Sequence, residues 1–286
     1  MGADVEKIPF TKMQGAGNDY VYLNGFTQEV KEPGELAVRI SDRHFGVGSD
    51  GLVIVGPSAV ADIRMRMFNA DGTEAEMCGN ASRCVAKFAH DAGLTRKKII
   101  RLETGAGVKT VELKFSGGEV IGATVDMGEP VLKPGLIPVA MPGQGPGITG
   151  EAIEVGGQEY RFTAVSMGNP HAVVMVENPD ALDLPVLGPQ FENHPWFPRR
   201  VNTEFVQVLG RDRIRMRVWE RGAGETLACG TGACAALVAC VLNGLTDREA
   251  LVGLRGGELK IRWDAADNHV YMSGPAVTVF EGVYFY

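Results

Sequence analysis

Two cysteines, Cys78 and Cys229, are each followed by glycine, and each stands at the start of a segment with the apolar residues of a buried helix. A helix N-terminus presents unpaired N–H groups and a partial positive charge, which favour a thiolate and attract anions. We therefore predict at both positions a thiol pKa below the ordinary value of ~8.5. The N–H groups that follow each thiol are predicted to form half of a carboxylate cradle; they belong to Gly79, Asn80, Gly230 and Thr231.

The segment that carries Cys78 is written twice in the chain. Residues 64–81 return as residues 215–232, which places the cysteines 229 − 78 = 151 positions apart. The same offset takes Gly17-Asn18 to Gly168-Asn169. An offset kept over such a distance indicates two copies of one supersecondary unit. If the copies face each other, one thiolate can remove a proton from a substrate carbon while the opposite thiol returns one, which is a two-base racemisation or epimerisation.

The elements around these residues are predicted to be strands with one central helix in each half. The helices begin near residues 79 and 230 and end near 92 and 243; shorter helices are expected at 35–45 and 184–192. Alternating or short apolar runs predict strands, at 8–14, 20–24, 51–56, 63–68, 99–104, 108–115, 120–126, 160–166, 172–177, 201–209, 214–219, 259–263, 270–273 and 277–284. The fold class is therefore α+β, with a strand-rich unit around each buried helix.

Residues 130–150 hold five prolines and five glycines, which marks a domain boundary. Net charge is −7, with 45% hydrophobic and 22% charged residues, typical of a globular protein and unfavourable for nucleic-acid binding. No apolar run is long enough for a membrane span, and the first residues lack a signal-peptide core. Five cysteines with no zinc-ligand spacing favour free thiols in a reducing, cytoplasmic setting and no metal.

Neither a lysine motif for pyridoxal phosphate nor a glycine-rich phosphate loop after a strand is evident, so no cofactor is expected. A carbanion formed at the site must then be stabilised by preorganised N–H dipoles and by exclusion of water.

The motifs together resemble those of diaminopimelate epimerases over nearly the whole chain. The resemblance is carried by Gly17-Asn-Asp19, Phe68-Asn-Ala-Asp-Gly72, Cys78-Gly-Asn-Ala-Ser-Arg-Cys84, Met167-Gly-Asn-Pro-His171, Val201-Asn202 and Glu220-Arg-Gly-Ala-Gly-Glu-Thr-Leu-Ala-Cys229-Gly-Thr-Gly232. It implies cofactor-independent interconversion of LL- and meso-diaminopimelate, in lysine and peptidoglycan biosynthesis. It also implies two pseudo-symmetric barrel-like domains, 1–129 with 275–286 and 130–274, because the last strand returns to the first domain, and a homodimer.

Carried over by position, the resemblance makes Cys78 and Cys229 the acid/base pair and assigns His171 and Glu220 to tuning the thiols. The substrate-binding positions that it implies are Asn18, Gly51, Asn69, Gly79, Asn80, Asn169, Asn202, Glu220, Arg221, Gly230 and Thr231. The chain departs from the family pattern at two places. Ala81 replaces a usual glycine, and Gly51 stands where some members have a ligand-binding glutamine, so a contact there can come only from backbone.

Three other functions fit part of the pattern. A related two-thiol racemase could act on proline, hydroxyproline or histidine, but Arg221 with Asn69 and Asn202 suits a substrate with a second amino-acid head. An amino-acid-binding protein would need no reactive thiol. A redox switch would use Cys78 and Cys229 as a reversible disulfide. The other cysteines, Cys84, Cys234 and Cys240, lie on apolar helix faces and are interpreted as core residues.

Overall fold

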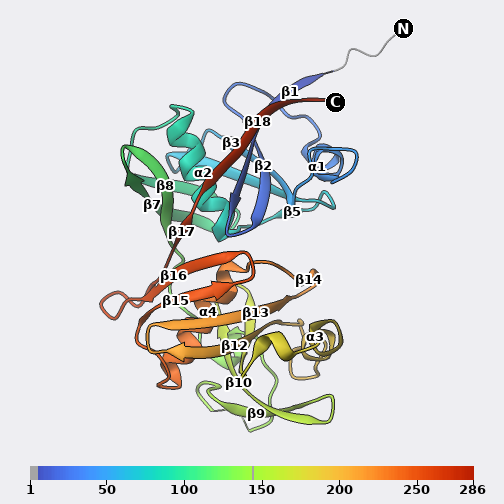
Figure 1. Ribbon diagram of the computed structural model, residues 1–286, viewed down its shortest axis with the longest axis vertical. Helices are drawn as coiled ribbons and strands as arrows, with labels where there is room; N and C mark the ends of the chain where they lie inside the picture. Colours follow the sequence, from blue (N-terminus) through green and yellow to red (C-terminus); the bar gives the residue numbers. More distant parts are fainter. Residues whose placement is uncertain (1–5, 144) are drawn as a thin grey trace. The chain divides into compact units, whose positions relative to one another are not determined.

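A computed structural model describes residues 6–143 and 145–286. The chain forms two compact units: one holds the residues up to Val125 together with Ser273–Tyr286, and the other holds Asp126–Met272 (Figure 1). Each unit is a mixed sheet curled around one helix, as the sequence predicts. Within the described residues no helix is long and apolar enough to cross a membrane.

The sheet of the first unit is built mostly from neighbours in sequence. In pairing order it contains β18 (Val277–Phe285), β1 (Lys7–Gly15), β2 (Asn18–Asn24), β3 (Gly51–Gly56), β4 (Ile63–Asn69), β6 (Ile99–Thr104), β7 (Gly107–Ser116) and β8 (Glu119–Asp126). The pairs β2–β3 and β4–β6 are parallel and the others antiparallel. The chain before β18 lies beside β8, since Ala276 N–H donates to the Ile121 carbonyl. The last strand, β18, pairs with the first, β1, and the segment before β18 lies beside β8, so the sheet curls back on itself.

Helix α2 (Gly79–Asp91) fills this curled sheet and contacts β1, β2, β3, β6 and β7. Its residues Ala81, Cys84, Val85 and Ala89 are buried. The helix stops where Gly93 adopts a left-handed φ of 70°, a conformation that glycine reaches without a Cβ clash. Helix α1 (Pro33–Ser41) packs against β3.

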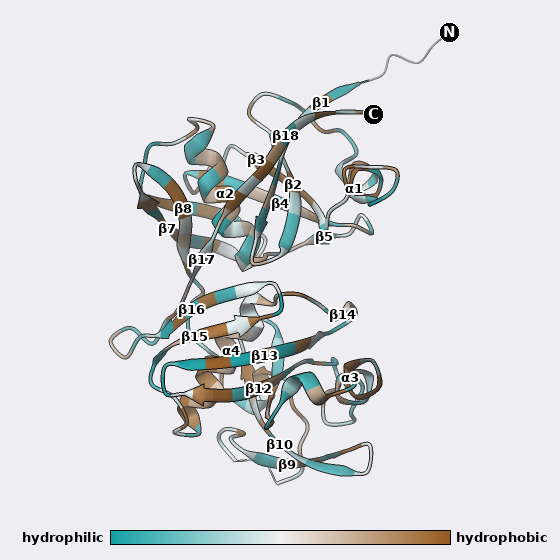
Figure 2. Cartoon of the chain, viewed as in Figure 1, coloured by the Kyte–Doolittle hydropathy of each residue, from teal (hydrophilic) through white to brown (hydrophobic). Residues whose placement is uncertain are grey.

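The second unit repeats the plan. Its strands, in pairing order, are β9 (Glu151–Val155), β10 (Gln158–Ser166), β11 (Pro170–Met175), β12 (Asn202–Gly210), β13 (Arg213–Glu220), β15 (Glu249–Leu254) and β16 (Gly257–Trp263), followed along the chain by β17 (Val270–Pro275). The pairs β11–β12 and β13–β15 are parallel. Helix α4 (Gly230–Leu242) is buried within this sheet and α3 (Leu184–Glu192) lies against β12 and β13. Hydrophilic and hydrophobic bands alternate along β13 (Figure 2), as its Arg-apolar pattern predicts.

The repeat is preserved to the residue in the two central helices, which begin at Gly79 and Gly230 and end at Asp91 and Leu242, 151 positions apart at each end. A two-residue strand precedes each helix: β5 (Glu74–Ala75) and β14 (Gly224–Glu225). The predicted pseudo-symmetry of two helix-centred units is thus confirmed.

Sequence reasoning missed three features of the fold. It gave no strand for β9 or β15, and it extended the first short helix to residue 45, whereas α1 ends at Ser41. The reason is Asp42, whose carboxylate accepts the backbone N–H groups of His44 and Phe45 and turns the chain out of the helix. Residues 130–150 contain the short turn η1 (Pro134–Leu136), and Ile137, Val139 and Ile148 belong to the core of the second unit.

Candidate active site

Cys78 is the residue that caps the N-terminus of α2. Its backbone is extended, with φ −134° and ψ 122°, and its carbonyl accepts the N–H and the hydroxyl of Ser82, both at 2.9 Å. Its thiol makes no capping bond to the helix and instead lies 3.3 Å from the side-chain oxygen of Asn18. The sulfur is therefore partly exposed beside the first N–H groups of the helix, where the sequence predicts an anion site.

Asn80 follows two residues later and is buried together with Arg83. The Asn80 side-chain oxygen accepts Arg83 Nη2 at 2.9 Å, and Arg83 Nε donates to the Pro275 carbonyl at 3.1 Å. The Asn80 amide thus ties the first turn of α2 to Arg83, which sequence reasoning missed. The group of Asn80 that is predicted to bind the substrate carboxylate is its backbone N–H.

Gly51 and Asn69 face each other across β3 and β4. A Cβ on Gly51 would come 2.1 Å from the Phe68 carbonyl oxygen, so the close approach of the strands excludes a side chain there. The Gly51 carbonyl accepts the Ser49 hydroxyl at 2.8 Å. The Asn69 amide donates to Thr73 Oγ1 at 3.0 Å, which holds the loop between β4 and β5.

Cys229 caps α4 with a backbone like that of Cys78, φ −118° and ψ 111°. Its side chain is only 5% exposed, and its sulfur accepts the Gly232 N–H at 3.4 Å. Thr231 Oγ1 lies 3.5 Å from the same sulfur. Gly230 and Thr231 thus occupy the same places in α4 that Gly79 and Asn80 occupy in α2.

The electrostatic setting of Cys229 differs from the prediction. Burial, followed by the charges of Glu220 and Glu204, raises the pKa of the Cys229 thiol well above its ordinary value. The hydrogen bonds from Thr231 and Gly232 act in the opposite direction but are outweighed. The predicted lowering of the thiol pKa is therefore wrong for Cys229 in the ligand-free protein, because the thiol is buried and two acidic side chains act on it.

Glu220 is the nearer of these acids. Burial raises the pKa of its carboxyl group, against hydrogen bonds from Thr226 and from the Cys229 thiol. Thr226 Oγ1 donates to Glu220 Oε1 at 2.5 Å. The charge of Glu220 thus raises the pKa of the Cys229 thiol, which fits its expected part in tuning that thiol.

His171 links the remaining polar groups of this half-site. Its Nδ1 lies 2.7 Å from Glu204 Oε1 and its Nε2 lies 3.0 Å from Asn169 Oδ1, with both His171 and Glu204 fully buried. Both ring nitrogens therefore face oxygens. Glu204 is a residue that sequence reasoning missed; it lies in β12, and no motif or spacing marks it.

Asn202 and Arg221 form a separate contact within the second unit. The Asn202 amide donates to the Pro170 carbonyl and accepts the Arg221 N–H, both at 2.9 Å. The Arg221 guanidinium donates to the Arg199 carbonyl at 3.1 Å and is exposed. Asn202 therefore positions the loop that presents Arg221.

That loop is also anchored by Glu192 at the end of α3, a second residue that sequence reasoning missed. Its carboxylate accepts Trp219 Nε1 at 2.7 Å, Gly222 N at 2.9 Å and Arg200 Nη1 at 2.9 Å.

Two groups of predicted residues are thus assembled, one in each unit. The first unit joins Cys78 to Asn18 and pairs Gly51 with Asn69. In the second unit Glu220, Glu204 and Thr231 act on Cys229, Glu204 contacts the His171–Asn169 pair, and Asn202 joins Arg221. Among the residues that the structure describes, no cluster of three or more metal-ligating side chains occurs.

Comparison with known proteins gives one family over most of the chain. A family model described as diaminopimelate epimerase matches residues 10–133 and 163–279. A protein of Desulfovibrio desulfuricans with the name diaminopimelate epimerase is 62% identical over 282 residues, covering 97% of this chain and 98% of its own. One of Acetivibrio thermocellus with the same name is 58% identical, covering 96% and 97%.

Solved structures extend the likeness at the level of the fold. A hydroxyproline epimerase from Agrobacterium vitis with bound trans-4-hydroxy-L-proline superposes with a TM-score of 0.68 at 15% identity, covering 99% of this chain and 93% of that one. A phenazine biosynthesis protein of the PhzF family from Bacillus anthracis gives a TM-score of 0.67 at 18% identity, covering 97% and 99%. At these identities the likeness shows a common fold.

Proposed function

Because the chain belongs to the diaminopimelate epimerase family and is an isomerase, we propose that it interconverts LL- and meso-diaminopimelate through Cys78 and Cys229, with no bound cofactor. The observation that carries this proposal is the duplicated cap: in each unit a Cys-Gly follows the two-residue strand, and its cysteine caps the central helix in the same extended conformation. The reaction is a step of lysine biosynthesis and supplies the meso isomer for peptidoglycan.

In the proposed reaction the two half-sites act on opposite faces of one α-carbon. One thiolate takes the α-proton, and the opposite thiol gives its proton to the other face, so the configuration inverts and the two sulfurs exchange protonation states. The α-carboxylate is held by the N–H groups of Gly79 and Asn80 on one side and of Gly230 and Thr231 on the other. These dipoles stabilise the negative charge that develops when the proton leaves.

The surroundings of the two sulfurs suggest a division of roles in the ligand-free enzyme. Cys229 is buried beside two acids and its raised pKa keeps it protonated. Cys78 is partly exposed at the mouth of α2. We therefore assign Cys229 as the proton donor and Cys78 as the base for the first turnover.

The distal amino-acid head of the substrate needs a donor for its carboxylate and acceptors for its ammonium. Arg221 is an exposed guanidinium on an anchored loop and suits the carboxylate. Asn69 and Asn202 supply amide groups, Asn18 and Asn169 complete the polar contacts, and Gly51 offers backbone alone. The charge of Glu220 raises the pKa of the Cys229 thiol, and His171 acts in turn on the carboxyl group of Glu220.

Exchange of the α-proton in D₂O tests the function directly. The reduced protein is incubated separately with LL-diaminopimelate, proline, trans-4-hydroxyproline and histidine, and loss of the α-proton is followed by NMR. We expect exchange with diaminopimelate alone. Replacement of either cysteine by alanine should stop inversion, whereas serine should leave a trace because a hydroxyl is a far weaker base. Exchange with proline or hydroxyproline instead would make the chain a different racemase of this fold.

A second measurement tests whether both sulfurs serve one substrate. Sulfurs that flank one carbon lie within reach of each other when the site closes, so mild oxidation should link Cys78 to Cys229 and abolish exchange until a thiol reductant is added. Peptide mapping identifies the bond. Full activity in fully oxidised protein would contradict the shared site.

We also propose that two copies of the chain associate through β18. Val279, Phe280, Val283 and Phe285 are all about half exposed on this strand, which is more apolar surface than a solvated strand needs. Light scattering after size exclusion should give twice the 30.6 kDa chain mass. Phe285→Glu should shift that mass toward the monomer.

A further inference from the structure

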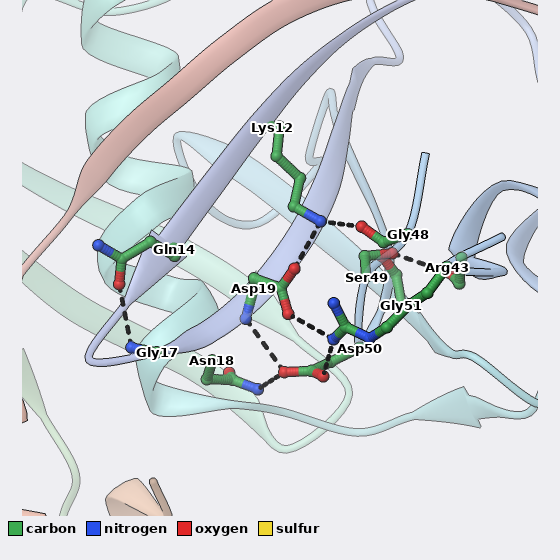
Figure 3. Close-up of polar contacts among 11 residues, drawn as sticks. Lys12, Gln14, Gly17, Asn18, Asp19, Arg43, Gly48, Ser49, Asp50 and Gly51 are labelled. Carbon is green, nitrogen blue, oxygen red and sulfur yellow. Dashed lines mark hydrogen bonds and ion pairs between the residues drawn. The ribbon is translucent and has the colours of Figure 1, made fainter. Parts of the chain in front are cut away.

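We propose that Asp50 is a positioning residue for the Cys78 half-site: its carboxylate fixes the side-chain amide of Asn18 so that the amide oxygen faces the Cys78 sulfur. The importance of this contact for turnover depends on the proposed function; the contact itself does not. Asn18 Oδ1 lies 3.3 Å from Cys78 Sγ. Asn18 Nδ2 donates to Asp50 Oδ2 at 2.8 Å (Figure 3).

Asp50 can hold only one end of the amide. A carboxylate accepts hydrogen bonds and donates none when ionised, so the Asn18 nitrogen must point toward it and the oxygen away. The Asp19 N–H donates to the same Asp50 oxygen at 3.1 Å, which fixes the carboxylate against the turn between β1 and β2.

The carboxylate is itself held by an ion network (Figure 3). Arg43 Nη2 lies 3.0 Å from Asp50 Oδ1 and 3.0 Å from Asp19 Oδ1. Lys12, which is buried, pairs with Asp19 at 2.5 Å and donates to the Gly48 carbonyl. Two cations and two carboxylates therefore surround the Asn18 contact, and the charge of Asp50 is compensated without the help of Cys78.

The internal repeat shows that only the first unit has this arrangement of a carboxylate, an asparagine and a cysteine. Asn169 stands 151 positions after Asn18, but its oxygen, not its nitrogen, is engaged, by His171 Nε2 at 3.0 Å. The position that corresponds to Asp50 is Val201, and the one that corresponds to His171 is Tyr20. The two asparagines are thus held by opposite ends, and Asn18 alone is turned to offer an acceptor to its cysteine.

An acceptor beside a thiol favours the protonated form over the thiolate. Asp50 should therefore disfavour ionisation of Cys78 in the free enzyme, acting through Asn18. This moderates but does not reverse the assignment of Cys78 as the first base, because Cys229 is more deeply buried and lies beside two acids. If Asp50 is removed, the amide can turn its NH₂ group to the sulfur and favour the thiolate instead.

A double-mutant cycle separates this role from a direct charge effect. In a Cys229→Ser background the other cysteines, Cys84, Cys234 and Cys240, are buried, so iodoacetamide reports on Cys78. The rate of alkylation is measured against pH for the parent, Asp50→Ala, Asn18→Ala and the double variant. We expect Asp50→Ala to lower the midpoint by about one pH unit, as for one hydrogen bond. In the Asn18→Ala background the same substitution should leave the midpoint unchanged.

Asp62→Ala is a matched control, since Asp62 also joins a cation, Lys97, and a backbone N–H, that of Arg101, in the first unit. It should leave the midpoint where it is. An equal shift from Asp50→Ala with and without Asn18, or no shift at all, would overturn the positioning role. Alkylation needs no substrate: a chain that shows the cycle but exchanges no diaminopimelate proton refutes the proposed function alone.

Discussion

The carboxylate of Glu204 lies 2.7 Å from His171 Nδ1, and both side chains are fully buried. The other Glu204 oxygen has no hydrogen-bond partner within the described residues. A Cβ on Gly232, in the first turn of α4, would lie 2.6 Å from Glu204 Oε1. The Glu204 carboxylate therefore lies beside the N-terminus of α4. The partial positive charge there stabilises Glu204 as well as the Cys229 thiolate.

Glu204→Gln should make Cys229 more reactive. The charge of Glu204 raises the Cys229 pKa, so its neutral amide should lower the midpoint of alkylation by about one pH unit, measured in a Cys78→Ser background. Glu249→Gln, a surface change in the same unit, serves as the control. An unchanged midpoint would mean that burial and Glu220 raise this pKa without a contribution from Glu204.

The two cysteines should react at different rates in the ligand-free protein. Only the thiolate attacks iodoacetamide, and the raised pKa of buried Cys229 keeps its thiolate fraction small at neutral pH. We expect Cys78 in the Cys229→Ser protein to be alkylated at least about tenfold faster at pH 7.5 than Cys229 in the Cys78→Ser protein. Mass spectrometry of the modified peptides measures both rates. Faster modification of Cys229 would reverse the acid and base roles assigned above.

Gly232→Ala should remove activity while the fold persists. The new methyl group would meet Glu204 Oε1 at 2.6 Å and Cys229 Sγ at 3.2 Å, so the first turn of α4 must shift. Overpacking of this kind costs about 1–3 kcal/mol of unfolding free energy, which urea denaturation measures. Gly210→Ala is the control, because its methyl group meets only Asp212 Oδ1 at an ordinary 3.4 Å. Full exchange activity in Gly232→Ala would show that the turn tolerates displacement.

Glu192→Ala should weaken substrate binding more than it slows the chemical step. It releases Gly222 N and Trp219 Nε1, which hold the loop of Arg221, and leaves those donors without their acceptor. We expect KM for diaminopimelate to rise about tenfold with a smaller fall in kcat, and unfolding free energy to fall by about 2–3 kcal/mol. Glu192→Gln keeps one acceptor oxygen and should recover part of the affinity. Equal losses in kcat and kcat/KM would place the loop in the chemical step.

The sequence was sufficient for features that depend on local pattern or on the repeat. The starts of α2 and α4, the glycine that ends α2 and the caps at Cys78 and Cys229 all follow from residues close together in the chain. The side chains that surround the two thiols could not be predicted in this way, because they are distant in sequence. Asn18 is 60 positions from Cys78, and Glu204 is 33 positions from His171. Asp50 precedes β3 in a short polar loop and Glu204 lies within β12, and no motif or spacing distinguishes either residue.

The path of the C-terminal strand fixes an order of events during synthesis. β18 lies along β1, and the Pro275 carbonyl just before it receives Arg83 from the helix that Cys78 caps. When synthesis has reached Met272, every residue of the second unit has been made, whereas the first unit still lacks β18. The half translated first is thus completed last.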